Sequence, residues 1–195
     1  MAKLSGAQVL ADMLSGYGVS HVFMVPAVLR RSFAEMERRT SIARIHTHGE
    51  KAAAYMADGY ARACGKPGVC MAQVVGALNL AAGLRDAWLA HSPVLAFTGG
   101  RDPKTKFRKV YQETDDVPAF EPVTKWNATV DAVERFPDML RQAFRVATSG
   151  ARARCTFSSA ATKARSTRKK PRWSRRSSRS SRACRRFGLC PILNP

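Results

Sequence analysis

The feature that most constrains the fold is an alternation of short apolar runs with longer segments of helical periodicity. Four runs read as buried strands, at residues 21–26, 42–47, 68–74 and 93–99. Helical spacing of apolar or small residues fills the intervals, and glycine or proline closes most segments. This order predicts an α/β fold: a doubly wound, mainly parallel sheet with helices on both faces. In such sheets, ligands bind beyond the carboxyl ends of the strands.

The charge of the chain divides it into two parts. The formal net charge of the 195 residues is +19, but every acidic residue lies within residues 1–150. Residues 151–195 are rich in arginine and serine and show no helical or strand period. A segment of that composition cannot bury a core. We therefore predict a globular domain at residues 1–150 and a disordered basic tail at residues 151–195.

Cysteine usage and hydropathy indicate where such a chain works. The five cysteines form no CxxC pair, and their odd number argues against a closed disulfide framework. Reduced thiols are typical of a cytoplasmic protein, which is the predicted location. No segment approaches the roughly 20 apolar residues that span a bilayer, so no membrane partner is expected.

One acidic residue stands out in the stretch "HTHGEKAAAYMADGYARACG". Glu50 follows a predicted strand and begins a predicted helix, where ligands bind in this fold class. Glu50 could act in catalysis. Alternatively, it could only interact with the helix dipole, which would stabilise the helix by about 0.3–1 kcal/mol. His46 and His48 precede it on one face of the strand. No further ligand stands at a useful spacing, so no metal site is predicted.

Several segments together resemble a known family. They are "VFMVPAVLRRSFAEM", "HGEKAAAYMADGYARACGKPGVC", "GALNLAAGLRDAWLAHSPVLAFTG", "YQETD" and "PVTKWNATVDAVERFPDMLRQAFRVATSG". In this order they resemble the N-terminal, pyrimidine-binding domain of thiamine-diphosphate-dependent enzymes, in the acetolactate synthase-like group. The resemblance covers roughly residues 4–150.

The resemblance implies roles for individual residues. A glutamate at the position of Glu50 hydrogen-bonds the N1′ nitrogen of the cofactor's aminopyrimidine in that family, and so activates the thiazolium carbon C2. Glu50 is thus the expected catalytic residue. Pro26, Gly76, Asn79 and Gln112 stand in segments that approach the cofactor and are expected to contact it. For Gln112, a solvated loop remains an equal alternative.

The resemblance also implies cofactors and partners. In the family, Mg²⁺ and the cofactor's diphosphate are bound by a separate C-terminal domain with a Gly-Asp-Gly…Asn motif, and a central domain carries FAD in some relatives. Neither domain is matched here. The cofactor is held between two chains, so a homodimer, or pairing with a full-length homologue, is expected. The small residues Ala52, Ala53, Ala54 and Ala57 would lie near that interface, or would serve ordinary helix packing.

The expected function is therefore that of an N-terminal fragment of a 2-oxo-acid carboligase or decarboxylase, inactive alone. Met24, Ala27, Val74 and Val75 replace residues that are usual in the family, which indicates a divergent relative. The alternative is a non-enzymatic protein that binds nucleic acid non-specifically through its basic tail.

The tail has a second interpretation. Family members continue after "FRVATSG" with a buried strand of the type "PVHLxL", which completes the sheet. Synonymous codons for residues 154–174, read in a shifted frame, encode that strand followed by an acidic linker. We therefore interpret residues from about 152 onward as frameshifted and expect the last strand to be lost. If a one-base insertion or deletion near codon 152 opens no long frame, this hypothesis fails.

Overall fold

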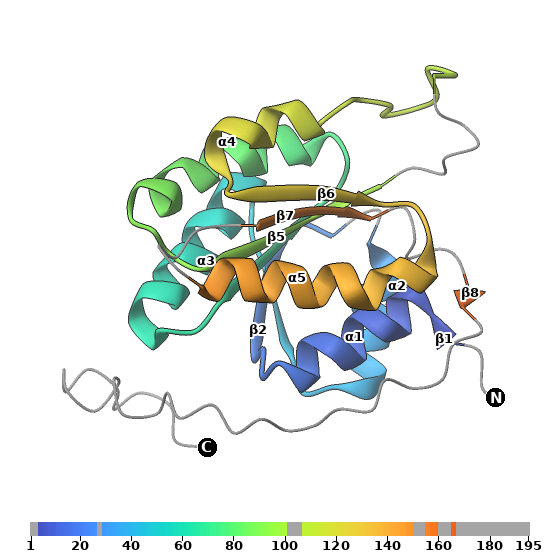
Figure 1. The fold of residues 1–195 in the computed structure, drawn as a ribbon, viewed down its shortest axis with the longest axis horizontal. Coiled ribbons are helices and arrows are strands. Elements are labelled where there is room, and N and C mark those ends of the chain that lie inside the picture. The colour runs from blue at the N-terminus through green and yellow to red at the C-terminus, as the bar shows by residue number, and fades with distance from the viewer. Residues whose placement is uncertain (1–3, 27–28, 101–106, 150–154, 160–164, 167–195) are drawn as a thin grey trace.

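The computed structural model describes residues 4–26, 29–100, 107–149, 155–159 and 165–166. Its centre is a parallel sheet of strand order β3-β2-β4-β5-β7-β6 (Figure 1). The six strands are β2 (His21–Met24), β3 (Ala43–His46), β4 (Gly68–Ala72), β5 (Val94–Gly99), β6 (Trp126–Val130) and β7 (Cys155–Ser159). A short antiparallel pair, β1 (Leu4–Ser5) with β8 (Arg165–Ser166), forms a separate two-stranded sheet.

Helices cover both faces of the central sheet, as predicted for a doubly wound fold. One face packs against α1 (Gly6–Gly16), α2 (Arg30–Arg39) and α5 (Phe136–Thr148). The other face packs against α3 (Glu50–Cys64), α4 (Gly76–Leu89) and the 3-10 helix η2 (Val117–Val123). The 3-10 helix η3 (Val133–Arg135) leads into α5. No helix in the described part of the chain is long and apolar enough to cross a membrane.

Local chemistry fixes the start of α1 and the end of α3. Ser5 caps α1 in a capping box: its hydroxyl accepts from the Gln8 amide, and the Gln8 side chain accepts from the Ser5 amide. Gly65 ends α3 in the left-handed region, at φ +64°, which few other residues adopt. These signals are local, so the sequence alone predicts them.

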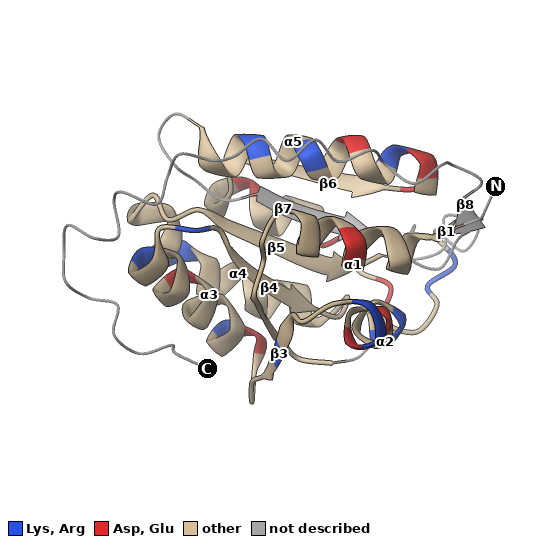
Figure 2. Ribbon diagram, turned by 90° about the horizontal axis from the view of Figure 1, so that it is seen from below, with Lys and Arg blue, Asp and Glu red and all other residues tan. Residues whose placement is uncertain are grey.

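Charge distribution separates the outside of the domain from its core. β4 and β5 carry no charged residue and are buried along their whole length. Lysine, arginine and acidic residues instead lie on the helices, notably α2 and α5 (Figure 2). Continuous burial of the central strands is typical of a parallel sheet covered on both faces.

The expectation that the last strand is lost is wrong. β7 lies inside the sheet and pairs in parallel with β5 on one side and β6 on the other. The sheet therefore extends past the predicted domain boundary at residue 150. Strand pairing needs only backbone donors and acceptors, which every residue of "CTFSS" supplies. The edge of β5 that a missing strand would leave unpaired is thus paired with β7.

The described part of the tail also contains a second, shorter strand. β8 lies at residues 165–166, within the segment predicted to be disordered, and pairs with β1. Residues 160–164 and 167–195, which hold most of the tail's basic residues, lie outside the described residues.

Candidate functional site

Glu50 lies where the sequence predicted, at the carboxyl edge of the sheet. β3 ends at His46 and α3 begins at Glu50, so three residues make the connection. Thr47 fixes that connection: its amide donates to the Met24 carbonyl at 3.0 Å, and its hydroxyl donates to the Gly49 carbonyl at 2.9 Å. The end of β2 and the start of α3 are thereby held together, and Glu50 is half-buried in the first turn.

Gly76 and Asn79 join Glu50 at this edge. The side-chain amide of Asn79 donates to Oε2 of Glu50 at 3.3 Å. A Cβ atom built on Gly76 would lie 2.7 Å from Cδ of Glu50 and would overlap Oε1. Only glycine therefore lets the start of α4 approach the carboxylate this closely. Three of the five predicted site residues form one cluster.

The other two predicted residues are not part of this cluster. Pro26 is exposed just after β2, beside a groove lined by Met24 and His46. Gln112 lies in the irregular segment before η2, and its amide donates to the Tyr111 hydroxyl at 3.2 Å. Among the described residues, neither side chain hydrogen-bonds Glu50. Their proposed cofactor contacts stay predictions.

The small residues of α3 serve packing within the chain. Ala53, Ala54 and Ala57 are fully buried in the core between α3, α4 and the sheet. Gly83 of α4 is equally constrained, since a Cβ there would lie 2.8 Å from the Lys51 carbonyl oxygen. Ala53, Ala54 and Ala57 therefore pack within this chain, and the expectation that this region lies near a subunit interface stays a prediction. Ordinary close packing, the other reading of the composition, accounts for them.

The exposed face of the same two helices was not predicted from the sequence. Five large apolar side chains on these helices or just before α4 stand at least a third exposed: Tyr55, Met56, Val75, Leu78 and Leu89. The carboxylate of Asp86 raises the pKa of Tyr55, which is the direction expected for a phenol beside a negative charge. The sequence could have indicated this exposed face, because in a helical period these residues fall on a different side from the alanines.

Other candidate chemistry is weaker. His46 and His48 are both exposed at the end of β3. Among the described residues, no three histidine, cysteine or acidic side chains gather as they would to hold a metal ion.

The arrangement so far defines a class: a parallel α/β domain that presents a half-buried carboxylate at its ligand-binding edge. Residues 4–119 match the family model described as thiamine pyrophosphate enzyme, N-terminal TPP binding domain. The chain belongs to this family (thiamine pyrophosphate is another name for thiamine diphosphate).

Several relatives are named as acetolactate synthases. The chain is 36% identical over 148 residues to a probable acetolactate synthase large subunit of Methanocaldococcus jannaschii, a match covering 75% of this chain and 25% of that protein. It is 37% identical to the chloroplastic acetolactate synthase of Arabidopsis thaliana (74% and 22%) and 34% identical to the acetolactate synthase of Bacillus subtilis (77% and 26%). The chain thus spans about a quarter of the length of these relatives.

Proposed function

We propose that this chain is the N-terminal part of a thiamine-diphosphate-dependent 2-oxo-acid carboligase or decarboxylase, and that Glu50 is its cofactor-activating residue. The observation that carries the proposal is the cluster of Glu50, Asn79 and Gly76 at the carboxyl edge of the sheet. The family match and the acetolactate synthase relatives support the cofactor and the substrate class.

The residues present suit an aminopyrimidine ring. Asn79 occupies Oε2 of Glu50, which leaves Oε1 above the hydrogen atoms of Gly76 as the oxygen for a ring nitrogen. Apolar side chains on the same helices, such as Leu78 and Tyr55, are exposed and can pack against a flat ring. A carboxyl group with one oxygen held by Asn79 and one available is a suitable partner for a heteroaromatic base.

The chemistry divides between cofactor and protein. Thiamine diphosphate, when bound, supplies the electron sink for breaking and forming bonds beside a carbonyl carbon. Glu50 holds or moves a proton at N1′ of the pyrimidine, and Asn79 orients the Glu50 carboxylate. Gly76 keeps the approach to that carboxylate open. These residues bind and polarise one end of the cofactor only.

The remaining parts of the proposal follow the family resemblance. Mg²⁺ and the diphosphate would be held by protein outside this chain, and FAD would belong to relatives that carry a central domain. The chain would be inactive alone and would work in the cytoplasm as a homodimer or paired with a full-length homologue. The exposed apolar residues of α3 and α4 support an interface there. A frameshift near codon 152 would explain the basic tail.

Thiamine, which lacks the diphosphate, tests the location of the site. We expect its addition to the full chain to shift the backbone amide NMR signals of Glu50, Gly76 and Asn79. Signals at the amino ends of the strands, such as that of His21, should not move. The control variant Glu121→Gln, an exposed residue of η2, should give the same shifts as the wild type. Shifts confined to the other end of the sheet would contradict the proposal.

A further inference from the structure

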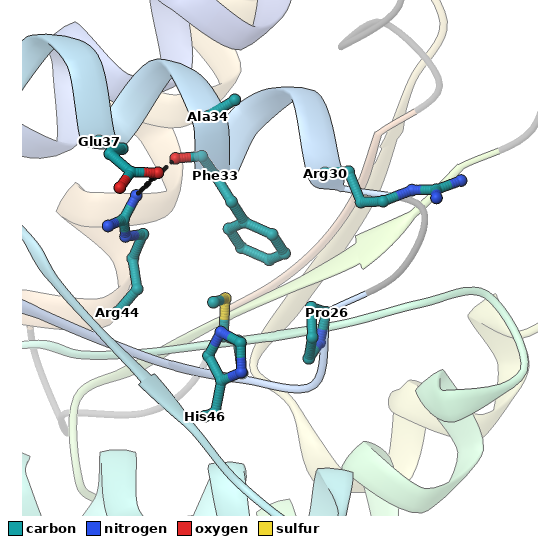
Figure 3. A pocket seen from close by; sticks show the side chains of 8 residues that line it. Pro26, Arg30, Phe33, Ala34, Glu37, Arg44 and His46 are labelled. Carbon is teal, nitrogen blue, oxygen red and sulfur yellow. Dashed lines mark hydrogen bonds and ion pairs between the residues drawn. The ribbon is translucent and has the colours of Figure 1, made fainter.

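The groove beside Pro26 forms a cavity on the opposite face of the sheet from Glu50. It occupies about 320 Å³ at the carboxyl ends of β2 and β3, beneath α2 (Figure 3). Two of its residues, Met24 and Phe33, belong to the core that packs against α1, α2 and α5. The helix that begins at Glu50 packs against the other face. Its lining residues are Met24, Pro26, Arg30, Phe33, Ala34, Glu37, Arg44 and His46.

Arg44 places in this cavity a guanidinium group that has unused hydrogen-bond donors. Its Nη1 donates to the Phe33 carbonyl at 3.0 Å and lies 3.1 Å from a carboxylate oxygen of Glu37. Within the described part of the chain, its Nε and Nη2 groups have no hydrogen-bond partner. The Arg44 side chain is only 24% exposed, whereas that of Glu37 is 69% exposed. A half-buried guanidinium with unused donors is a ready partner for a carboxylate, which it can bind through two parallel hydrogen bonds.

The rest of the lining sets the shape of the ligand. The Phe33 ring points from α2 into the cavity, towards Pro26 and His46 on the opposite wall (Figure 3). Ala34 and Met24 add further apolar surface. Arg30 stands at the rim and extends away from the cavity, so it adds positive charge at the entrance (Figure 3). A cavity of this size and lining suits a small molecule with one charged end and a flat apolar body.

We propose that this cavity binds a small organic monocarboxylate, with its carboxylate on Arg44 and its flat apolar body against Phe33 and Pro26. The site uses none of Glu50, Gly76 and Asn79, and shares only Pro26 with the predicted cofactor contacts. It rests on side chains of α2, β2 and β3 rather than on those of α3 and α4.

Benzoate is the probe, measured by isothermal titration against the full 195-residue chain. We expect one benzoate per chain with a dissociation constant in the millimolar range or tighter, and at least about tenfold weaker binding of neutral benzamide. Arg44→Gln should weaken benzoate binding by about tenfold or more. Arg31→Gln removes an exposed charge from the same helix outside the cavity and should leave the affinity unchanged.

A second variant keeps the proposal testable if Arg44→Gln does not fold. Ala34 is exposed on α2, so Ala34→Phe fills the cavity without removing a charge and should also abolish binding. The proposal is overturned if Arg44→Gln and Ala34→Phe both bind benzoate as the wild type does, because the binding then lies elsewhere, for example on the basic tail. It is equally overturned if the wild type binds no benzoate at about 10 mM.

Discussion

Replacing Ser158 by proline is expected to lower the free energy of unfolding by about 3 kcal/mol or more. Ser158 lies in β7, opposite Thr98 of β5 and Thr129 of β6. A proline there removes a backbone donor from a strand that is paired on both sides, and its ring disturbs the ladder. Because β7 is the one strand that pairs with β6 among the described residues, the loss also weakens the attachment of β6. Urea unfolding followed by circular dichroism measures the change.

The matched variant Ser158→Thr separates this backbone effect from a side-chain effect. Threonine keeps the amide donor and favours strands, so its free energy of unfolding should stay within about 1 kcal/mol of the wild type. Equal stability of the proline and threonine variants would show that β7 is not part of the folded sheet in solution.

Gly76→Ala is expected to leave the fold intact while displacing the Glu50 carboxylate. The added methyl group would overlap Oε1 and lie 2.7 Å from Cδ of Glu50, and these are atoms of a side chain that can rotate away. We expect the free energy of unfolding to change by less than about 1 kcal/mol and the affinity for thiamine to fall about tenfold or more. Urea unfolding and titration with thiamine measure the two quantities.

Gly59→Ala is the matched control for that variant. Gly59 lies within α3, and a Cβ built there meets nothing within 4 Å. Alanine at this helical position should stabilise the chain by about 0.5–1 kcal/mol and leave thiamine binding unchanged. If Gly76→Ala binds thiamine as well as Gly59→Ala does, the approach of Gly76 to Glu50 has no role in binding.

Most of the fold could be predicted from the sequence because its signals are local. Buried parallel strands read as continuous apolar runs, and glycine or a capping serine marks several of the helix ends. β7 could not be predicted in this way. "CTFSS" is short and only weakly apolar, and it gains its structure from the two strands beside it. Pairing across a sheet is a tertiary effect that overrides local composition.

The candidate site was predictable where the chain itself brings residues together. Glu50 and Gly76 each follow a strand, and all parallel strands of one sheet end at the same edge. The hydrogen bond from Asn79 to Glu50 follows from that geometry. Gln112 lies in a segment without regular structure, so neither periodicity nor strand order fixes its distance from Glu50. The exposed apolar side chains of α3 and α4 were not predicted, because the alanine pattern indicates only the buried face of α3.

The proton affinity of the thiamine pyrimidine in the presence of the protein tests the central claim most directly. A carboxylate at hydrogen-bond distance stabilises a protonated ring nitrogen. ¹⁵N NMR of labelled thiamine, followed as a function of pH, should therefore show the proton affinity of N1′ raised about tenfold or more when the full chain is bound. Glu50→Gln should return it to the value of free thiamine. An N1′ titration that is the same with the wild type, with Glu50→Gln and without protein would contradict the role proposed for Glu50.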